Sequence, residues 1–184
     1  MPEMRGLIVV INRGVLIEPL VAWLWASAQR YPAVALEMPR GREIAAERNL
    51  GAQRAQDFPW VLFVDSDCVP PRHAIATLEG RQVGLVGGVI LARHAEPIIC
   101  ATKTFEPTVM YTLEAFREHS IGIRPVLALG TGCLMMRREV LAAVGSPWFR
   151  CGQLVSEYLT EDTDFCLRAA ARGFIPSLDL EVRV

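Results

Sequence analysis

Apolar runs alternate with helical patterns along the first half of the chain. The expected strands are Gly6–Ile11, Ala33–Met38, Trp60–Val64 and Val83–Leu91, each bounded by polar or turn-forming residues. Between them, a segment with Pro19 in its first turn and the segments Arg42–Gln56 and Arg72–Glu79 have helical spacing. The order β-α-β-α-β-α-β is typical of parallel strands joined by right-handed crossovers. We therefore expect an α/β fold with a mostly parallel central sheet flanked by helices.

The second half of the chain has a weaker pattern. Residues 92–125 are expected to hold substrate-facing loops, with an edge strand over Ile98–Phe105 and a helix over Val109–Glu118. One or two short buried strands are expected in Val126–Met136, around a Gly-Thr-Gly bend. Beyond it we expect a helix over Arg138–Val144, a loop over Phe149–Leu159, a helix over Glu161–Arg172 capped by Thr160, and a last strand over Ile175–Val184.

Two helices have packing faces that can be read from the sequence. The first is expected to pack through Ile17, Leu20, Val21 and Leu24. The second packs through small residues, and Arg48 falls on the same face, so its charge needs a partner. Two partners are open: Asp65, in a structural ion pair, or a diphosphate, which a guanidinium fork suits well.

Composition narrows the function classes. The chain has 184 residues, which fits one domain, and it is 52% apolar with a net charge of −1, so it has no basic excess for binding nucleic acid. Its five cysteines and three histidines form no CxxC, HxH or HExxH arrangement, which argues against a zinc site built by the protein alone. No apolar run approaches the roughly 20 residues of a transmembrane segment. We expect a cytoplasmic protein.

The run Trp60–Pro71, WVLFVDSDCVPP, is the centre of the functional hypothesis. A strand buried on both faces ends at Asp65-Ser66-Asp67, and open α/β sheets bind ligands outside the carboxyl ends of their strands. Two carboxylates at i and i+2 can converge on Mg²⁺ or Mn²⁺ and leave coordination positions open for phosphate oxygens. Alternatively, the two aspartates only stop the strand and cap the next helix. Their position directly after a buried strand favours the functional interpretation.

A second acidic cluster begins the last predicted helix. Acidic residues in a first turn are favoured by the helix dipole, and Asp164 can pair with Arg168 at i+4. Asp162 lies at the leading edge of the apolar face, where a carboxylate could act as a general base at the rim of a cleft. Taken alone, the cluster favours the structural interpretation.

Five segments, in order, resemble the family 2 glycosyltransferases and their relatives with the GT-A fold. They cover most of the chain: VVINR at 9–13, AERNLGAQRA at 46–55, WVLFVDSD at 60–67, GTGCLMMRREVLAAVG at 130–145 and TEDTDFCLRAAARGF at 160–174. The resemblance implies a single GT-A-type, Rossmann-like domain over residues 1–184. It also implies transfer of a sugar, as in hexosyltransferases, from a UDP- or GDP-linked donor to a hydroxyl acceptor, with inversion and with Mn²⁺ or Mg²⁺.

The resemblance also implies roles for individual residues. Donor or substrate binding would involve Asn12, Arg48, Asp65, Ser66, Gly132 and Glu161. Asp65 would face the nucleotide sugar and contribute to the metal site, while Asp67 would hold the metal on the diphosphate. Asp162 would take the proton of the acceptor hydroxyl, and Gly130–Gly132 would shape the floor of the sugar and acceptor pocket.

The chain departs from the family pattern in two places. Glu37-Met38-Pro39 stands where relatives usually have an aspartate in a D-x-S-type turn, which bears on nucleotide preference. Relatives often continue to a histidine past the last strand, whereas this sequence stops at Val184, so we interpret it as a truncated or minimal catalytic core.

Two other functions are compatible with the same residues. VLFVDSDCV also fits the nucleophile loop of a haloacid-dehalogenase-like phosphatase, with Asp65 as nucleophile and Asp67 as acid/base. That enzyme would have the loop near its N-terminus and a lysine after a later strand, and here the only lysine is Lys103. A non-catalytic module that binds nucleotides or glycans is the third interpretation.

Overall fold

A seven-stranded sheet forms the centre of the molecule. The computed structural model describes residues 6–12, 14–37, 43–92, 98–104, 109–112, 114, 121–154 and 157–184. Across the sheet the strands are β2 (Ala33–Glu37), β1 (Leu7–Asn12), β3 (Trp60–Asp65), β10 (Cys133–Arg137), β4 (Leu85–Val89), β13 (Ser177–Arg183) and β8 (Ile123–Pro125). All but two run in the same direction, because only β10 and β8 are antiparallel to their neighbours. The predicted mostly parallel α/β sheet is confirmed.

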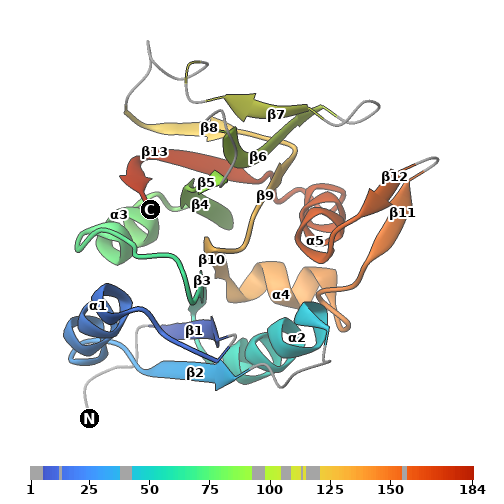
Figure 1. Ribbon diagram of the computed structural model, residues 1–184. Coiled ribbons are helices and arrows are strands. Elements are labelled where there is room, and N and C mark those ends of the chain that lie inside the picture. Colours follow the sequence, from blue (N-terminus) through green and yellow to red (C-terminus); the bar gives the residue numbers. More distant parts are fainter. Residues whose placement is uncertain are drawn as a thin grey trace.

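Helices cover both faces of this sheet (Figure 1). One face carries α2 (Ile44–Arg54), α4 (Arg138–Val144) and α5 (Glu161–Ala170), and the other carries α1 (Glu18–Ala28) and α3 (Ala74–Gly80). The strands β1 and β3 alternate between the two cores: Val61 and Phe63 face the α2 side, whereas Leu62 and Val64 face the α1 side. Both faces are therefore dry, which is why these strands are continuous apolar runs in the sequence.

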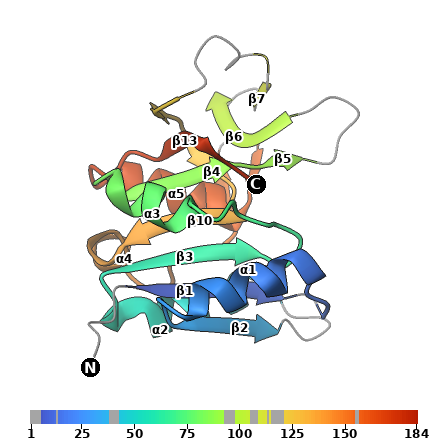
Figure 2. The ribbon, with the colours of Figure 1, turned by 90° about the vertical axis from the view of Figure 1, so that its left-hand side faces the viewer.

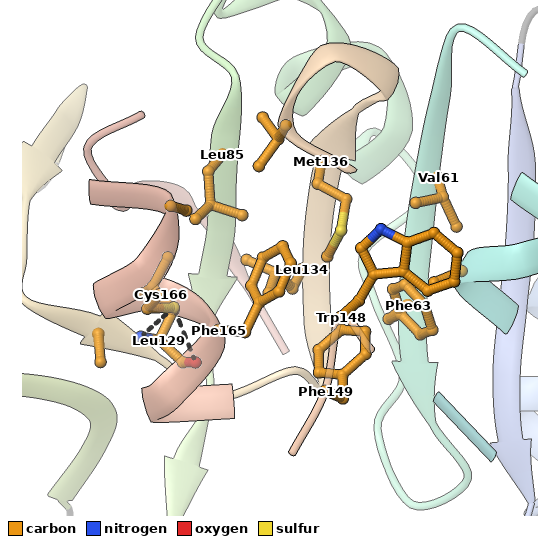
Figure 3. Close-up of a cluster of buried hydrophobic side chains, with 14 of the residues drawn as sticks. Val61, Phe63, Leu85, Leu129, Leu134, Met136, Trp148, Phe149, Phe165 and Cys166 are labelled. Atoms are coloured by element: carbon orange, nitrogen blue, oxygen red, sulfur yellow. Dashed lines mark hydrogen bonds between the residues drawn. The ribbon is translucent and has the colours of Figure 1, made fainter. Parts of the chain in front are cut away.

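The core under α5 is built from aromatic rings. Phe149 stacks on Phe165 with ring centroids 4.9 Å apart and meets Phe63 edge-on at 5.4 Å. Figure 3 shows these rings beside Trp148, with Cys166 against the backbone of Leu129. This packing fixes the start of α5 relative to the end of β3.

Two smaller sheets accompany the main one, and the larger of the two can be followed in Figure 2. Strand β6 (Ile98–Thr104) pairs antiparallel with β5 (Leu91–Ala92), β7 (Val109–Thr112) and β9 (Ala128–Leu129). A separate hairpin joins β11 (Gly152–Leu154) to β12 (Glu157–Leu159). No helix in the part of the chain seen here is long and apolar enough to cross a membrane.

Three local expectations were wrong in whole or in part. The helix expected from Val109 is strand β7 where the structure describes it, because its apolar and β-branched residues pair with β6; most of residues 113–118 lie outside the described part. The loop expected over Phe149–Leu159 contains the β11–β12 hairpin. The face expected for helix α1 was right at Leu20 and Leu24, which pack on the core, and wrong at Ile17 and Val21, which are exposed. Trp23 is buried instead, and its Nε1 donates a hydrogen bond to the Pro71 carbonyl.

A buried carboxylate in β13 depends on one arginine. Asp179 is fully buried, and Arg81 Nε, from the turn after α3, donates to its Oδ2 at 2.6 Å. Arg81 Nη2 also pairs with Glu181 Oε1 at 2.8 Å. The hydrogen bonds from Arg81 and the Gly122 amide lower the pKa of Glu181. Arg81 therefore ties α3 to β13.

We predict that Arg81→Ala lowers the free energy of unfolding by about 2 kcal/mol near neutral pH, because it leaves a buried carboxylate without its cation. The exposed Arg54, removed as Arg54→Ala, is the matched control, with an expected change within about 0.5 kcal/mol. Urea denaturation measures both.

Because the pKa of Glu181 is lowered by folding, the contribution of Glu181 to stability exists above the unfolded glutamate pKa and is lost as pH falls through the folded value. The difference between wild type and Arg81→Ala should accordingly shrink in acid, and an equal cost for the two variants at neutral pH would contradict this.

Candidate functional site

The carboxyl ends of β1 and β3 lie side by side. Ile11 is the register partner of Asp65, and the Ser66 amide donates to the Ile11 carbonyl at 3.1 Å, so the turn after β3 is fixed against the end of β1. Asn12 is buried, and its Oδ1 accepts a hydrogen bond from the Gly14 amide at 2.9 Å. Asn12 thus shapes the turn that follows β1, where the glycine has a φ of +111°.

Arg48 is a buried cation between two carboxylates. It is only 3% exposed, and its Nη2 donates to Asp65 Oδ1 at 3.2 Å while its Nη1 donates to Glu161 Oε1. The three side chains come from α2, β3 and α5. The ion pair expected as one of two partners for Arg48 is therefore present, and Glu161 is a second partner.

A cavity of about 390 Å³ opens beside this ionic bridge. It is lined by Asp65 and Arg48, by Asp162 at the start of α5, and by the Gly130-Thr131-Gly132 turn, its floor, which approaches Asp65 at Gly132 and Asp162 at Gly130. Arg48 and Asp65 both line the cavity, so their ion pair forms part of its wall. Of the other predicted site residues, Asn12, Ser66, Asp67 and Glu161 are not among the described lining residues.

Two glycines keep the cavity floor low. A Cβ on Gly132 would lie 3.0 Å from Cys68 Sγ and 3.3 Å from Asp65 Oδ2. A Cβ on Gly130 would lie 3.1 Å from the Cβ of Cys100 and 3.9 Å from Asp162 Oδ2. A side chain at either position would fill space in front of a carboxylate, so the Gly-x-Gly pattern is a steric requirement of this site.

Asp162 has one oxygen held and one directed toward the cavity floor. Its Oδ1 accepts hydrogen bonds from Thr160 Oγ1 and from the Thr163 amide, the latter at 2.8 Å. Its Oδ2 would lie 3.9 Å from a Cβ on Gly130. Thr160 is the N-cap residue of α5 as predicted, but its hydroxyl binds Asp162 and makes no cap bond to the backbone. The predicted Asp164–Arg168 pair is present at 2.7 Å.

Asp67 lies in the exposed turn beyond Asp65. Burial and the charges of Asp65 and Asp67 raise the pKa of the neighbouring Cys68 thiol to about 12, so it stays protonated. Among the residues described, no three His, Cys, Asp or Glu side chains gather as a metal site. A cation held by Asp65 and Asp67 would have to take its remaining ligands from a bound ligand and from water, as Mg²⁺ does at phosphates.

Part of the cavity lining was not predicted from the sequence. Cys100 and Thr102 reach the cavity from β6, and Tyr158 reaches it from the β11–β12 hairpin while remaining 73% exposed. The expectation of substrate-facing loops in residues 92–125 pointed to the right region without naming these residues. Nothing in the sequence marked Tyr158.

We predict that Arg48→Met lowers the free energy of unfolding by about 3 kcal/mol, because Asp65 and Glu161 then face one another without a cation. Adding Glu161→Gln should recover part of that loss by removing one of the two charges. Urea denaturation of the single and double variants measures the recovery. A double variant no more stable than Arg48→Met would show that the bridge is not the source of the cost.

The family model described as "Glycosyltransferase like family 2" matches residues 5–175, and no curated protein sequence matches the chain. Among solved structures, A197 from STIV aligns with a TM-score of 0.68 at 18% identity, covering 97% of this chain and 83% of that one.

Two further structures were solved with ligands. GalNAc-T7 with UDP, GalNAc and Mn²⁺ aligns with a TM-score of 0.67 at 11% identity, covering 99% of this chain and 43% of that one. S. aureus TarS 1-349 in complex with UDP-GlcNAc aligns with a TM-score of 0.53 at 13% identity, covering 98% and 58%. The chain spans less than two thirds of the length of these two. At such identities the likeness shows the fold alone, and that fold is GT-A.

Proposed function

We propose, since this chain belongs to the glycosyltransferase-like family 2, that it transfers a sugar from a nucleoside-diphosphate sugar to an acceptor hydroxyl. The observation that carries the proposal is that Asp65, at the end of β3, and Asp162, at the start of α5, line the same cavity. A donor at Asp65 and an acceptor at Asp162 would meet over the glycine floor.

The donor side would be organised by the turn after β3. Asp65, oriented by Arg48, would accept hydrogen bonds from the nucleotide sugar, and Asn12 and Ser66 would position the nucleotide at the ends of β1 and β3. Mg²⁺ or Mn²⁺ held by Asp67 and Asp65 would supply positive charge for the diphosphate as it leaves. Arg48 is the one cation among the described lining residues and already pairs with two carboxylates, so a metal would supply the positive charge for the diphosphate. The UDP bound to GalNAc-T7 supports a UDP-linked donor, with a GDP-linked donor as the other candidate.

The acceptor side would be organised by α5. The bond between the sugar's anomeric carbon and the diphosphate oxygen breaks while the acceptor oxygen bonds to that carbon. Asp162 Oδ2 takes the hydroxyl proton. Because Oδ1 is already held by Thr160 and Thr163, the carboxylate is oriented before the acceptor arrives. A base across the cavity from the leaving group favours attack from the opposite face, hence inversion.

We predict that a nucleoside diphosphate with Mn²⁺ raises the melting temperature of the wild type. Asp67→Ala should abolish that rise, because the cation loses a ligand. The exposed Asp57, removed as Asp57→Ala, is the matched control and should respond as the wild type does. A thermal-shift panel of UDP, GDP and their sugars, with and without Mn²⁺, measures this. A flat panel, or an Asp67→Ala response equal to the wild type's, would overturn the metal–diphosphate assignment.

We predict that Asp162→Asn lowers the rate of sugar transfer by roughly 10²- to 10⁴-fold, the usual contribution of a general base. Its thermal shift with nucleotide and Mn²⁺ should match the wild type's, because Asp162 does not touch the donor's diphosphate. Transfer is measured by release of the nucleoside diphosphate, and product NMR assigns the anomer. Retained activity in Asp162→Asn would contradict its role as base. Nucleotide binding without transfer to any acceptor would favour the non-catalytic module.

A further inference from the structure

A second cavity, of about 790 Å³, lies on the opposite face of the sheet between α1 and the segment that leads into α3. None of its described lining residues lines the cavity at Asp65 and Asp162. Both helices that border it can be followed in Figure 2. Its volume is within the range of small-molecule sites in proteins, roughly 300–1,000 Å³.

The floor of this second cavity is apolar and firmly held. Trp23 is 7% exposed, and its Nε1 donates to the Pro71 carbonyl at 3.3 Å. Tyr31 packs on Trp60 with ring centroids 5.2 Å apart, and Ile75 is buried at the start of α3. The space above the floor exists because the facing helix positions Ala22, Ala26 and Ala76 carry small, exposed side chains.

The rim is positively charged. Arg30 follows α1, Arg72 precedes α3 and Arg183 ends β13, and all three line the cavity with exposed side chains. No acidic residue is found among the described lining, and within the described chain none of these arginines forms an ion pair. The acids of β13 are engaged elsewhere, since both Asp179 and Glu181 pair with Arg81.

Only one of these three arginines has a structural explanation that needs no ligand. A cation after α1 is favoured by the helix dipole, which accounts for Arg30 alone. Arg72 comes from a loop, and Arg183 Nε donates to the Leu180 carbonyl at 3.3 Å, which leaves its terminal nitrogens unengaged by that bond. In a chain of net charge −1, cations from three separate elements meet at one apolar cavity without a counter-charge.

We propose that this second cavity binds an amphipathic phosphate, an alkyl phosphate whose head is held by Arg30, Arg72 and Arg183 and whose hydrocarbon lies on the Trp23, Tyr31 and Ile75 floor. Guanidinium groups bind phosphate oxygens in a bidentate fork, and a multiply charged head relieves the repulsion among the cations. The hydrocarbon gains by leaving water on an aromatic floor. The site is independent of the proposed transferase function.

Calorimetric titration with octyl phosphate, kept below its micelle concentration, tests the proposal. Saturable binding is expected, and Arg72→Ala should weaken it by about tenfold, the weight of one charge-assisted hydrogen bond. Ala26→Leu, which fills the cavity and keeps α1 helical, should weaken it at least as much. Arg54→Ala and Asp67→Ala should bind as the wild type does. Circular dichroism confirms that each variant is folded.

Three further probes separate the sources of the phosphate. Inorganic phosphate and neutral octanol should each bind far more weakly than octyl phosphate. Phosphatidylcholine vesicles that contain phosphatidic acid are the membrane arm, and capture by them that is lost in Arg72→Ala supports a lipid as the source. The proposal is overturned if octyl phosphate does not saturate, if inorganic phosphate binds as tightly, if Arg72→Ala and Ala26→Leu bind like the wild type, or if vesicles bind and monomeric octyl phosphate does not. Nucleotide-induced thermal shifts in Arg72→Ala report on the transferase site separately.

Discussion

The buried guanidinium of Arg48 is the interaction on which the candidate site depends. Asp65 ends a central strand and Glu161 begins a helix 113 residues away from Arg48, and two carboxylates so placed would repel one another in a low dielectric. One cation with a planar fork holds both. Because α2 places Arg48 through the packing of Ala45 and Ala52, the geometry of the site is inherited from a dry helix–sheet interface.

The reversed strand β10 completes that geometry. It runs antiparallel between β3 and β4, so its first residues lie at the edge where the parallel strands end. The Asp65 amide donates to the Gly132 carbonyl at 3.2 Å, which brings the Gly130–Gly132 turn directly against the carboxylate. An all-parallel order would bring the opposite end of β10 to this edge. The antiparallel insertion is therefore what gives the cavity its floor, and the aromatic core under α5 is what sets its far wall.

Local sequence patterns predicted the features that depend on neighbouring residues in the chain. Continuous apolar runs gave β1 and β3, and Arg48 was recognised as a charge on a packing face that needs a partner. That Glu161 would be a partner of Arg48 could not be predicted from the sequence, because this contact depends on where α5 packs. The same holds for β7, which exists through its pairing with β6, and for the buried Trp23 of α1, which donates a hydrogen bond to the distant Pro71 carbonyl. The roles of Asn12, Ser66, Asp67 and Asp162 in catalysis or binding remain predictions.

One connection, from Asp65 to Arg72, belongs to both cavities. Its first residue, Asp65, lines the cavity that contains two carboxylates. Val69 to Arg72 line the second cavity, which contains three arginines. Pro70 and Pro71 restrict the backbone between these ends, and the bond from Trp23 anchors it, so the two charge patterns are held apart. A bare anion is attracted to the arginines and repelled by the carboxylates. Under the proposed functions, a diphosphate would approach Asp65 together with a cation, and this separation of charge would let the protein distinguish a metal-bound nucleotide from a free organic phosphate.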